Sequence, residues 1–510
     1  MKKNIYKKTL HLWMVVLFSS PSYSQENSSN VDAGSSARAA SIVPRISITE
    51  YYTDNYYRTN ENKQSGWTTD VSPGVHLSSS TGRIVGSLDY SLHQIIQSND
   101  SSKNELQNAL DATGSVEIID KWAFVDANGK ISQRTISAFG TQSTVDGFSN
   151  ANKTEVSSYR VSPYIKGRLS YFADYEARYE ASTTRAKDAQ FANTNGQSAN
   201  FKLNGVGLNG RLHWGSQIST NKVEQSSNQT SRSDSIKNTL GYLIDPQFNL
   251  TASFGREYGN YSPSENSYKN TSGIGAIWTP SERTTVSADI ENAYAGKMHK
   301  LNFEHRTPKT SWRVSDAKSV SLTNSITSNS IQGNTYDLLF SQLASIEPDP
   351  IKRAEMVNNL LLTNYGTSSG SILNGYLTSG ASIQRTRDFS FSLLGVRDIL
   401  TFTAMQSVGQ KINQSSIGFD GANAITQRAI TFSLTHRLNP DTSLNTQLTS
   451  QKTSSDGSNL TSNLKSFSVD ASTKLNLKTI ATFGVRRTIY SGGISPYNAN
   501  SINGGLSVQF

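Results

Sequence analysis

The chain has 510 residues, of which 35% are apolar, and it contains 22 tyrosines, 19 phenylalanines and no cysteine. A chain this polar is either disordered or a β structure with apolar residues on one face, and the many aromatic residues favour the second. Four of the nine net positive charges lie within the first eight residues, and the remaining +5 is too mild to indicate a nucleic-acid partner. Without cysteine the protein forms no disulfide.

Residues 1–24 have the pattern of a secretory signal peptide. A basic region precedes an apolar stretch from Leu10 to Phe18, and Ser22-Tyr23-Ser24 has the small-x-small pattern of a cleavage site. The basic region contains Lys2, Lys3, Lys7 and Lys8. We expect export with removal of this segment, and a flexible leader over residues 25–43. No later run approaches the ~20 apolar residues that a membrane helix needs.

From residue 44 onward, apolar and polar residues alternate in segments of about ten residues. In residues 248–255, Phe, Leu, Ala and Phe alternate with Asn, Thr, Ser and Gly. Short turns with Pro, Asp or Asn, such as 244–246 and 438–441, alternate with longer polar stretches such as 225–234 and 411–424. Short turns at one end of the strands and long loops at the other are typical of an outer-membrane barrel.

The pattern predicts an all-β fold, a transmembrane antiparallel up-and-down β-barrel over residues 44–510. Counting the segments gives about twenty strands, within a range of about 16 to 22, and an even number places both termini on the periplasmic side. The expected strands are 44–56, 68–79, 83–97, 152–165, 168–182, 200–208, 211–224, 235–244, 247–258, 270–279, 283–293, 298–306, 309–327, 384–396, 399–410, 425–437, 442–452, 461–475, 479–490 and 501–510.

Two insertions on the long-loop side interrupt the strand pattern. Residues 98–151 include an apolar piece at 116–125, and residues 328–383 contain apolar residues at helical spacing, broken at Pro348 and Pro350. The helical positions are Leu338, Leu339, Leu343, Ile346, Met356, Val357, Leu360 and Leu361. Loops of this length are usually functional or disordered. Our hypothesis is that one or both insertions fold over or into the pore.

Three stretches of the sequence resemble one protein family. They are Pro44-Arg45-Ile46 with TEYYTDNYYRTN (49–60), VSPGVHLSSSTGRIVGSLDYSL (71–92), and IWTPSERTTVSADIENAYAGKMHKLNFEHRTPKTSWRVS (277–315). They look like the outer-membrane proteins of the PEP-CTERM/exosortase system, a family encoded beside exopolysaccharide synthesis and export genes. The likeness runs over most of the mature chain, although Asp316 stands where that family usually has Tyr. It implies an outer-membrane barrel in a polysaccharide-producing envelope and implies no particular activity.

Charged residues on the polar phase of the predicted strands are the candidate functional residues. They are Asp289, Glu291, Glu304, Arg306, Arg313, Arg437, Asp470, Lys474 and Arg486. In a barrel interior they either pair with each other as structural ladders or line a water-filled path that sets selectivity. The histidines and serines of the sequence match no nucleophile, zinc or phosphate motif, so we expect no catalytic residue, no metal site and no cofactor.

The chain ends on another alternating segment, and its last residue is aromatic. Ile502, Leu506, Val508 and Phe510 share one phase, as a strand in lipid requires. A terminal aromatic residue on a final barrel strand resembles the signal by which the outer-membrane assembly machinery recognises its clients. Phe510 is therefore the predicted assembly signal.

Together these features predict a non-enzymatic barrel in the cell outer membrane, with the lipid bilayer and the assembly machinery as partners. The leading hypothesis is a passive pore or an accessory protein for polysaccharide export, with exopolysaccharide and export components as further partners. One alternative is a non-conducting surface scaffold that binds polysaccharide or sorted proteins through its insertions. Another alternative is a general diffusion porin.

Overall fold

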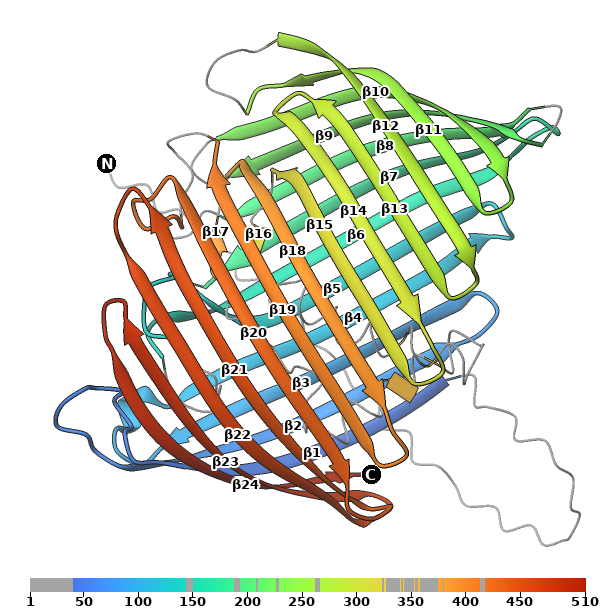
Figure 1. Cartoon of the computed structure of the whole chain (residues 1–510). Helices are drawn as coiled ribbons and strands as arrows, with labels where there is room; N and C mark the ends of the chain where they lie inside the picture. The colour runs from blue at the N-terminus through green and yellow to red at the C-terminus, as the bar shows by residue number, and fades with distance from the viewer. Residues whose placement is uncertain are drawn as a thin grey trace, which may run out of the picture. The chain divides into compact units, whose positions relative to one another are not determined.

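The computed structural model describes residues 40–143, 150–187, 193–207, 210–225, 229–261, 267–322, 325–326, 340, 343, 353, 356–357, 375–378, 380–412 and 418–510. Twenty-two strands form one antiparallel sheet that closes on itself (Figure 1). The sheet closes because the first strand, β1 (Ala40–Thr53), pairs with β2 (Gly66–Ser80) on one edge and with the last strand, β24 (Tyr497–Gln509), on the other. The predicted all-β barrel is confirmed, at the upper limit of the predicted strand range.

Each barrel strand pairs with the preceding and the following one, so the connectivity is up-and-down. The next strands are β3 (Ile84–Gln97), β4 (Glu105–Ile119), β5 (Ala123–Thr135), β6 (Lys153–Leu169), β7 (Ala173–Ala186), β8 (Thr194–Val206), β9 (Leu212–Gln225), β10 (Thr230–Asp245), β11 (Phe248–Gly259) and β12 (Ser267–Ser281). They are followed by β13 (Thr284–Ala293), β14 (Gly296–Arg306), β15 (Thr310–Ser321), β18 (Ser382–Leu394), β19 (Asp398–Lys411), β20 (Ala424–Arg437), β21 (Thr442–Asp456), β22 (Thr461–Asn476) and β23 (Thr479–Gly492).

Smaller elements lie between the barrel strands along the chain. A 3-10 helix, η1 (Ser101–Lys103), precedes β4, and β16 (Ser325–Ile326) pairs with β17 (Leu377–Thr378) in a separate two-stranded ladder. Among the described residues, no helix is long and apolar enough to cross a membrane.

The two barrel strands beyond the predicted twenty are β4 and β5, and they correct the interpretation of 98–151 as one long loop. The apolar piece at 116–125 contains the end of β4, the short turn at 120–122 and the start of β5, with Lys121 in the turn at a φ of 54°. The outward phase of β4 contains Asn108 and Gly114, and these residues break the apolar alternation that identified the other strands. The true long connection is the segment between β5 and β6. At the N-terminal side, β1 begins at Ala40, inside the predicted leader.

The outer surface of the barrel is apolar and the lumen is polar, the reverse of a soluble protein. On neighbouring strands β11 and β12, Phe254 is 54% exposed and Ile274 is 68% exposed. The residues that alternate with them along the same strands, such as Ser253 and Gly273, face the other side of the sheet. This arrangement is that of a transmembrane barrel, in which short turns mark the periplasmic end and long loops the extracellular end.

The last strand joins the outward apolar phase, as its sequence predicted. Leu506 is opposite Ile48 and Val508 is opposite Ile46 of β1. The backbone N–H of Phe510 donates to the carbonyl of Pro44 at 3.0 Å, and its side chain is 66% exposed. Phe510 therefore stands at the periplasmic rim of the strand that closes the barrel.

Candidate functional site: the closed lumen of the barrel

The lumen wall formed by β1 to β7 is lined with ion pairs that bridge strands. Arg45 lies 2.5 Å from Asp89, two strands away, and Arg178 on β7 lies 2.7 Å from Asp126 on β5. Lys130 and Asp111 add a longer pair at 3.7 Å. Because each charge has an opposite neighbour, this wall is a ladder of neutralised pairs.

The predicted lumen charges all lie on the phase opposite the exposed apolar residues, and the structure brings some of them together. Glu304 on β14 lies 3.7 Å from Arg313 on β15. Asp470 on β22 lies diagonally across from Arg486 on β23, since Ser468 is directly opposite Arg486.

The remaining predicted charges take other partners or stand apart. Glu291 pairs with Lys237 at 2.6 Å, a residue that the sequence did not single out. Asp289 lies opposite Lys300, and the Arg306 guanidinium donates to the Glu282 carbonyl at 3.2 Å. Arg437 and Lys474 are exposed near short turns. The nine residues therefore form pairs and isolated charges along several strands and do not form one ring.

On the opposite wall, formed by β18 to β22, uncharged polar residues outnumber lumen-facing charges such as Asp388, Arg437 and Asp470. On β21 the seven lumen-facing residues from Ser443 to Ser455 are all Ser, Thr, Asn or Gln. Asn445 is buried and accepts hydrogen bonds from the hydroxyls of Ser433 and Thr435 on β20, at 3.1 and 3.2 Å. The lumen surface of β21 therefore consists of hydroxyl and amide groups.

At the periplasmic end, residues of the 328–383 insertion pack inside the barrel. Leu343 and Val357 are buried, and Phe340, Leu394 and Ile399 pack against them. Leu394 and Ile399 are opposite each other in the β18–β19 hairpin, on its lumen-facing phase. Of the predicted helical positions, Leu343, Met356 and Val357 are described and have helical backbone conformation, and the others lie outside the described residues. The insertion therefore reaches the periplasmic end of the lumen.

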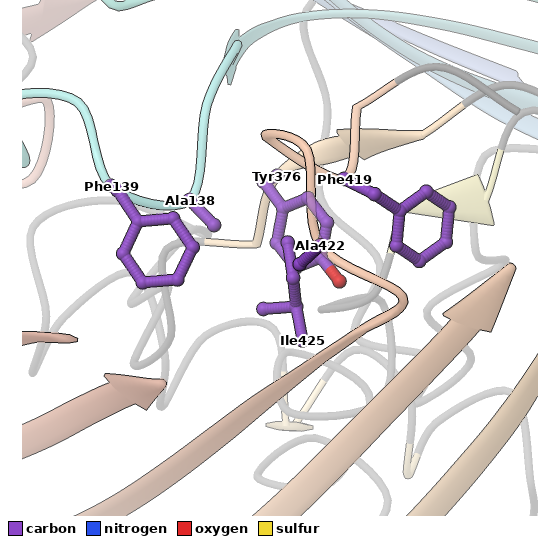
Figure 2. Close-up of a cluster of buried hydrophobic side chains, with 6 residues drawn as sticks. All are labelled: Ala138, Phe139, Tyr376, Phe419, Ala422 and Ile425. Atoms are coloured by element: carbon purple, nitrogen blue, oxygen red, sulfur yellow. The ribbon is translucent and has the colours of Figure 1, made fainter. Parts of the chain in front are cut away.

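At the extracellular end, segments from three connections meet in one apolar cluster, which we call the cap (Figure 2). Its members are Ala138 and Phe139 after β5, Tyr376 before β18, Phe419 and Ala422 after β19, and Ile425 at the start of β20. All six are at most 3% exposed. Thr135 at the end of β5 also forms a parallel bridge with Tyr376. The segment after β5 and the end of the 328–383 insertion therefore meet at the extracellular end of the barrel.

Hydrogen bonds from two tyrosines tie the segment after β5 to β23 and β24, on the other side of the closure between β1 and β24. The Tyr490 hydroxyl on β23 donates to the carbonyls of Phe139 and Gly140, each at 3.0 Å. The Tyr497 hydroxyl on β24 donates to the carbonyl of Gln142 at 2.6 Å. Gln142 is itself buried and donates back to three carbonyls of its own segment. The segment after β5 thus crosses from β5 to β23 and β24 in a fixed conformation.

One carboxylate lies inside the cap. The Ser137 hydroxyl donates to Asp420 at 2.9 Å and accepts the backbone N–H groups of Phe139 and Gly140 at 3.1 Å. Burial raises the pKa of Asp420 above its ordinary value, and the hydrogen bond from Ser137 only partly offsets this effect. The cap is therefore more stable with Asp420 protonated.

Sequence reasoning named none of the cap residues. The sequence contains only weak signs of these contacts. Tyr490 is a large aromatic residue on the polar phase of its strand, and Phe139 and Phe419 lie in polar loops. Among the described residues, no group of three or more His, Asp or Glu side chains is arranged to hold a metal ion.

A closed barrel with an apolar outer band, a polar lumen and short turns at one end has the architecture that spans bacterial outer membranes. The chain is an outer-membrane β-barrel. No family model and no curated protein sequence matches it.

Similar solved structures include three bacterial receptors and transporters. The FrpB iron transporter of Neisseria meningitidis is 11% identical with a TM-score of 0.49, over 92% of this chain and 81% of that one. The ferric enterobactin receptor PfeA of Pseudomonas aeruginosa is 11% identical with a TM-score of 0.47, over 92% and 80%. The siderophore receptor PirA of the same organism is 12% identical with a TM-score of 0.43, over 92% and 80%. Similarity at this level says nothing of what this chain binds.

Proposed function

We propose that this barrel is a passive, gated outer-membrane pore that works in polysaccharide export. In this role hydrated sugar chains pass along the lumen by transient hydrogen bonds, and synthesis at the inner membrane sets the direction of movement. The cap and the insertion close the lumen at rest. Displacement of both opens it.

The observation that carries the proposal is the uncharged, polar lumen face of β21. Sugars are rich in hydroxyl groups, and Ser, Thr, Asn and Gln exchange hydrogen bonds with them without the strong attraction of a charged group. Conduction requires binding that is weak and repeated at many sites, and the seven polar residues of β21 offer such a track.

Two buried hydroxyls on β18 and β19 support a lumen that can open to water or sugar. In the part of the chain that the structure describes, the hydroxyls of Ser390 on β18 and Thr401 on β19 are buried and make no hydrogen bond. A buried polar group without a partner costs about 1–3 kcal/mol. When the insertion leaves, these hydroxyls become available to water or sugar, which lowers the free-energy cost of opening.

The sequence resemblance supplies the setting. The stretches at 49–60, 71–92 and 277–315 resemble barrels encoded beside exopolysaccharide genes. We therefore propose the PEP-CTERM/exosortase system as the cellular context and the exported polymer and other export components as partners. Membership of that family remains a proposal that rests on these stretches.

Single-channel recording in planar bilayers tests the pore. The wild-type barrel is expected to be mostly closed, and a variant that lacks residues 327–376 and has 137–143 replaced by a Gly-Ser linker is expected to show large, stable conductance. A neutral oligosaccharide added to one side should block this current briefly and repeatedly. A barrel that stays silent in both forms would exclude every transport function. Matched expression and heat-resistant electrophoretic migration control for folding.

A second candidate function is a non-conducting surface scaffold, and the closed cap favours it. Gene deletion separates the two: a pore predicts polymer retained in the periplasm, whereas a scaffold predicts polymer outside the cell in normal amounts but detached from its surface. A general diffusion porin is the third candidate, and it predicts loss of small-solute uptake without any change in the polymer. The fully buried cap residues argue for a lumen that opens on demand over one that is always open.

A further inference from the structure

The outer surface of β20 to β23, the orange and red strands in Figure 1, carries a row of exposed cations. They are Arg428 on β20, Lys452 on β21, Lys465 on β22 and Arg487 on β23. Each lies on the outward phase with apolar neighbours two or four residues away: Ile430, Leu448, Phe467 and Val485 are exposed on the same face. The four cations therefore stand on the surface that meets lipid.

Their depth places them at one boundary of the membrane. Arg428 and Lys465 are nine and eleven residues from the short-turn ends of their strands, and Lys452 and Arg487 are ten and eight residues from theirs. A tilted strand needs ~9–11 residues to cross the hydrocarbon layer. The row therefore lies where the outer-leaflet headgroups begin.

The charges in this row are not neutralised by the protein. Arg428 and Lys452 are directly opposite each other in the β20–β21 register, an arrangement of like charges that is unfavourable by itself. Lys465 is opposite Ser450 and thus diagonal to Lys452. Within the described residues, none of the four cations forms an ion pair, and the outward phase of β20 to β23 has one acid, Asp456, at the extracellular end of β21.

Among the described residues, several other cations on the outer surface are paired with acids, and the four cations of the row are not. On the far side of the barrel, Lys222 lies 2.6 Å from Glu224 and Arg232 lies 2.8 Å from Asp234. Beside the row, Asp316 holds Arg385 at 2.6 Å and Arg387 at 3.2 Å. The row differs from these pairs because it brings four cations together on neighbouring strands without an acidic partner in the described part of the chain.

We propose that Arg428, Lys452, Lys465 and Arg487 bind the phosphorylated headgroup of an outer-leaflet glycolipid. Cations at a membrane surface attract anionic headgroups, and long Arg and Lys side chains reach from a lipid-facing strand to the headgroup layer. The occupant is a lipid because its acyl chains would lie on the apolar band directly below, formed by residues such as Ile430 and Phe467. Cross-strand repulsion between Arg428 and Lys452 is relieved when a phosphate lies between them.

The test measures binding of bisphosphorylated lipid A to the purified full-length barrel in detergent. The double variant R428Q/K452Q is expected to weaken binding about 30-fold, and all four Gln substitutions together should weaken it further. The matched control is K222Q/R232Q, which also removes two outward cations and should leave affinity within about twofold. Lipid A without phosphates should not bind, and millimolar inorganic phosphate should not displace the intact lipid.

Several results would overturn the proposal. Equal loss in R428Q/K452Q and K222Q/R232Q would show that net charge alone matters, and retention of phosphate-free lipid would show that the apolar band is sufficient. Displacement by inorganic phosphate would indicate a site for a free anion, and preferential binding of an acidic polysaccharide would indicate a polymer site. Arg428→Lys keeps the charge and should keep binding. If the double variant does not fold, lipid A binding by the single variants Lys465→Gln and Arg487→Gln tests the proposal instead.

Discussion

The Tyr490 hydroxyl on β23 donates a hydrogen bond to the backbone carbonyl of Phe139, 351 residues earlier in the chain, at 3.0 Å. This contact spans the extracellular mouth of the barrel, because Phe139 follows β5 and Tyr490 belongs to a strand near the closure point. The same hydroxyl also reaches the carbonyl of Gly140. The Tyr490 side chain thus fixes the position of the loop that follows β5.

Tyr490→Phe removes the hydroxyl and leaves two buried carbonyls without this donor. Loss of such a partner costs about 1–3 kcal/mol, so the cap should open at least about fivefold more often. Backbone hydrogen exchange of residues 137–142 measures this directly, whether or not the barrel conducts. Tyr159→Phe, on the outward face of β6, is the matched control and should change nothing. Unaltered exchange in Tyr490→Phe would show that the cap is held by its apolar cluster alone.

Leu394→Ala should loosen the insertion at the periplasmic end. The Leu394 side chain packs against the buried pair Leu343 and Val357, and truncation of a partly buried leucine costs about 2 kcal/mol. Hydrogen exchange of Leu343 and Val357 is expected to accelerate, and the cap should be unaffected. Leu393→Ala, the adjacent residue on the lipid-facing phase, is the control. Equal acceleration in both variants would place the effect in the hairpin itself and not in its contact with the insertion.

The stability of the cap should depend on pH through Asp420. Burial raises the pKa of this carboxyl in the closed state, so the closed state binds the proton more tightly than the open state does. This contribution is fully present at low pH and is lost as the pH rises through the pKa of the open state and then that of the closed state. Acidification from about pH 7 to about pH 4 should therefore raise the protection of residues 137–142 from hydrogen exchange, measured relative to the intrinsic exchange rate at each pH.

Asp420→Asn should abolish this pH dependence and hold the cap closed at neutral pH, since the amide oxygen can still accept from Ser137. Tyr376 and Tyr490, the other titratable groups beside Asp420, remain neutral over this range. Asp456→Asn, at the exposed end of β21, is the control and should leave the pH dependence intact. A cap that becomes less stable on acidification would contradict the predicted direction of this pH dependence.

Removal of Phe510 should impair assembly in the outer membrane. The side chain is exposed at the periplasmic rim and makes no contact that the barrel needs for closure, since β24 already pairs with β1 up to Gln509. The expected result is less protein in the outer membrane and more degradation in the periplasm, with normal refolding of purified protein in detergent. Phe510→Tyr should assemble normally. Normal outer-membrane levels without Phe510 would remove its role as an assembly signal.

Much of the barrel follows from short-range sequence patterns. Alternation with a period of two decides which side chains meet lipid, and Leu250, Phe254 and Leu506 lie outward as this pattern predicts. The pattern failed for β4, where Asn108 and Gly114 occupy outward positions. Asn108 is tolerated there because its side-chain amide Nδ2 donates to the carboxylate of Glu155 on β6, on the same outer face, at 3.2 Å. That compensation comes from a strand two places away and leaves no local trace.

The sequence by itself determined the transmembrane barrel, the polar lumen phase and the outward direction of Phe510, because each depends on neighbours a few residues apart. Only the tertiary structure decided the cap, the partners of the lumen charges and the row of four cations. Phe139, Tyr376 and Phe419 meet because three connections bend inward to the same place, and Arg428 faces Lys452 because the hairpin register aligns them. Such contacts join residues far apart in the chain, and no local periodicity encodes which loop enters the barrel or which strands become neighbours.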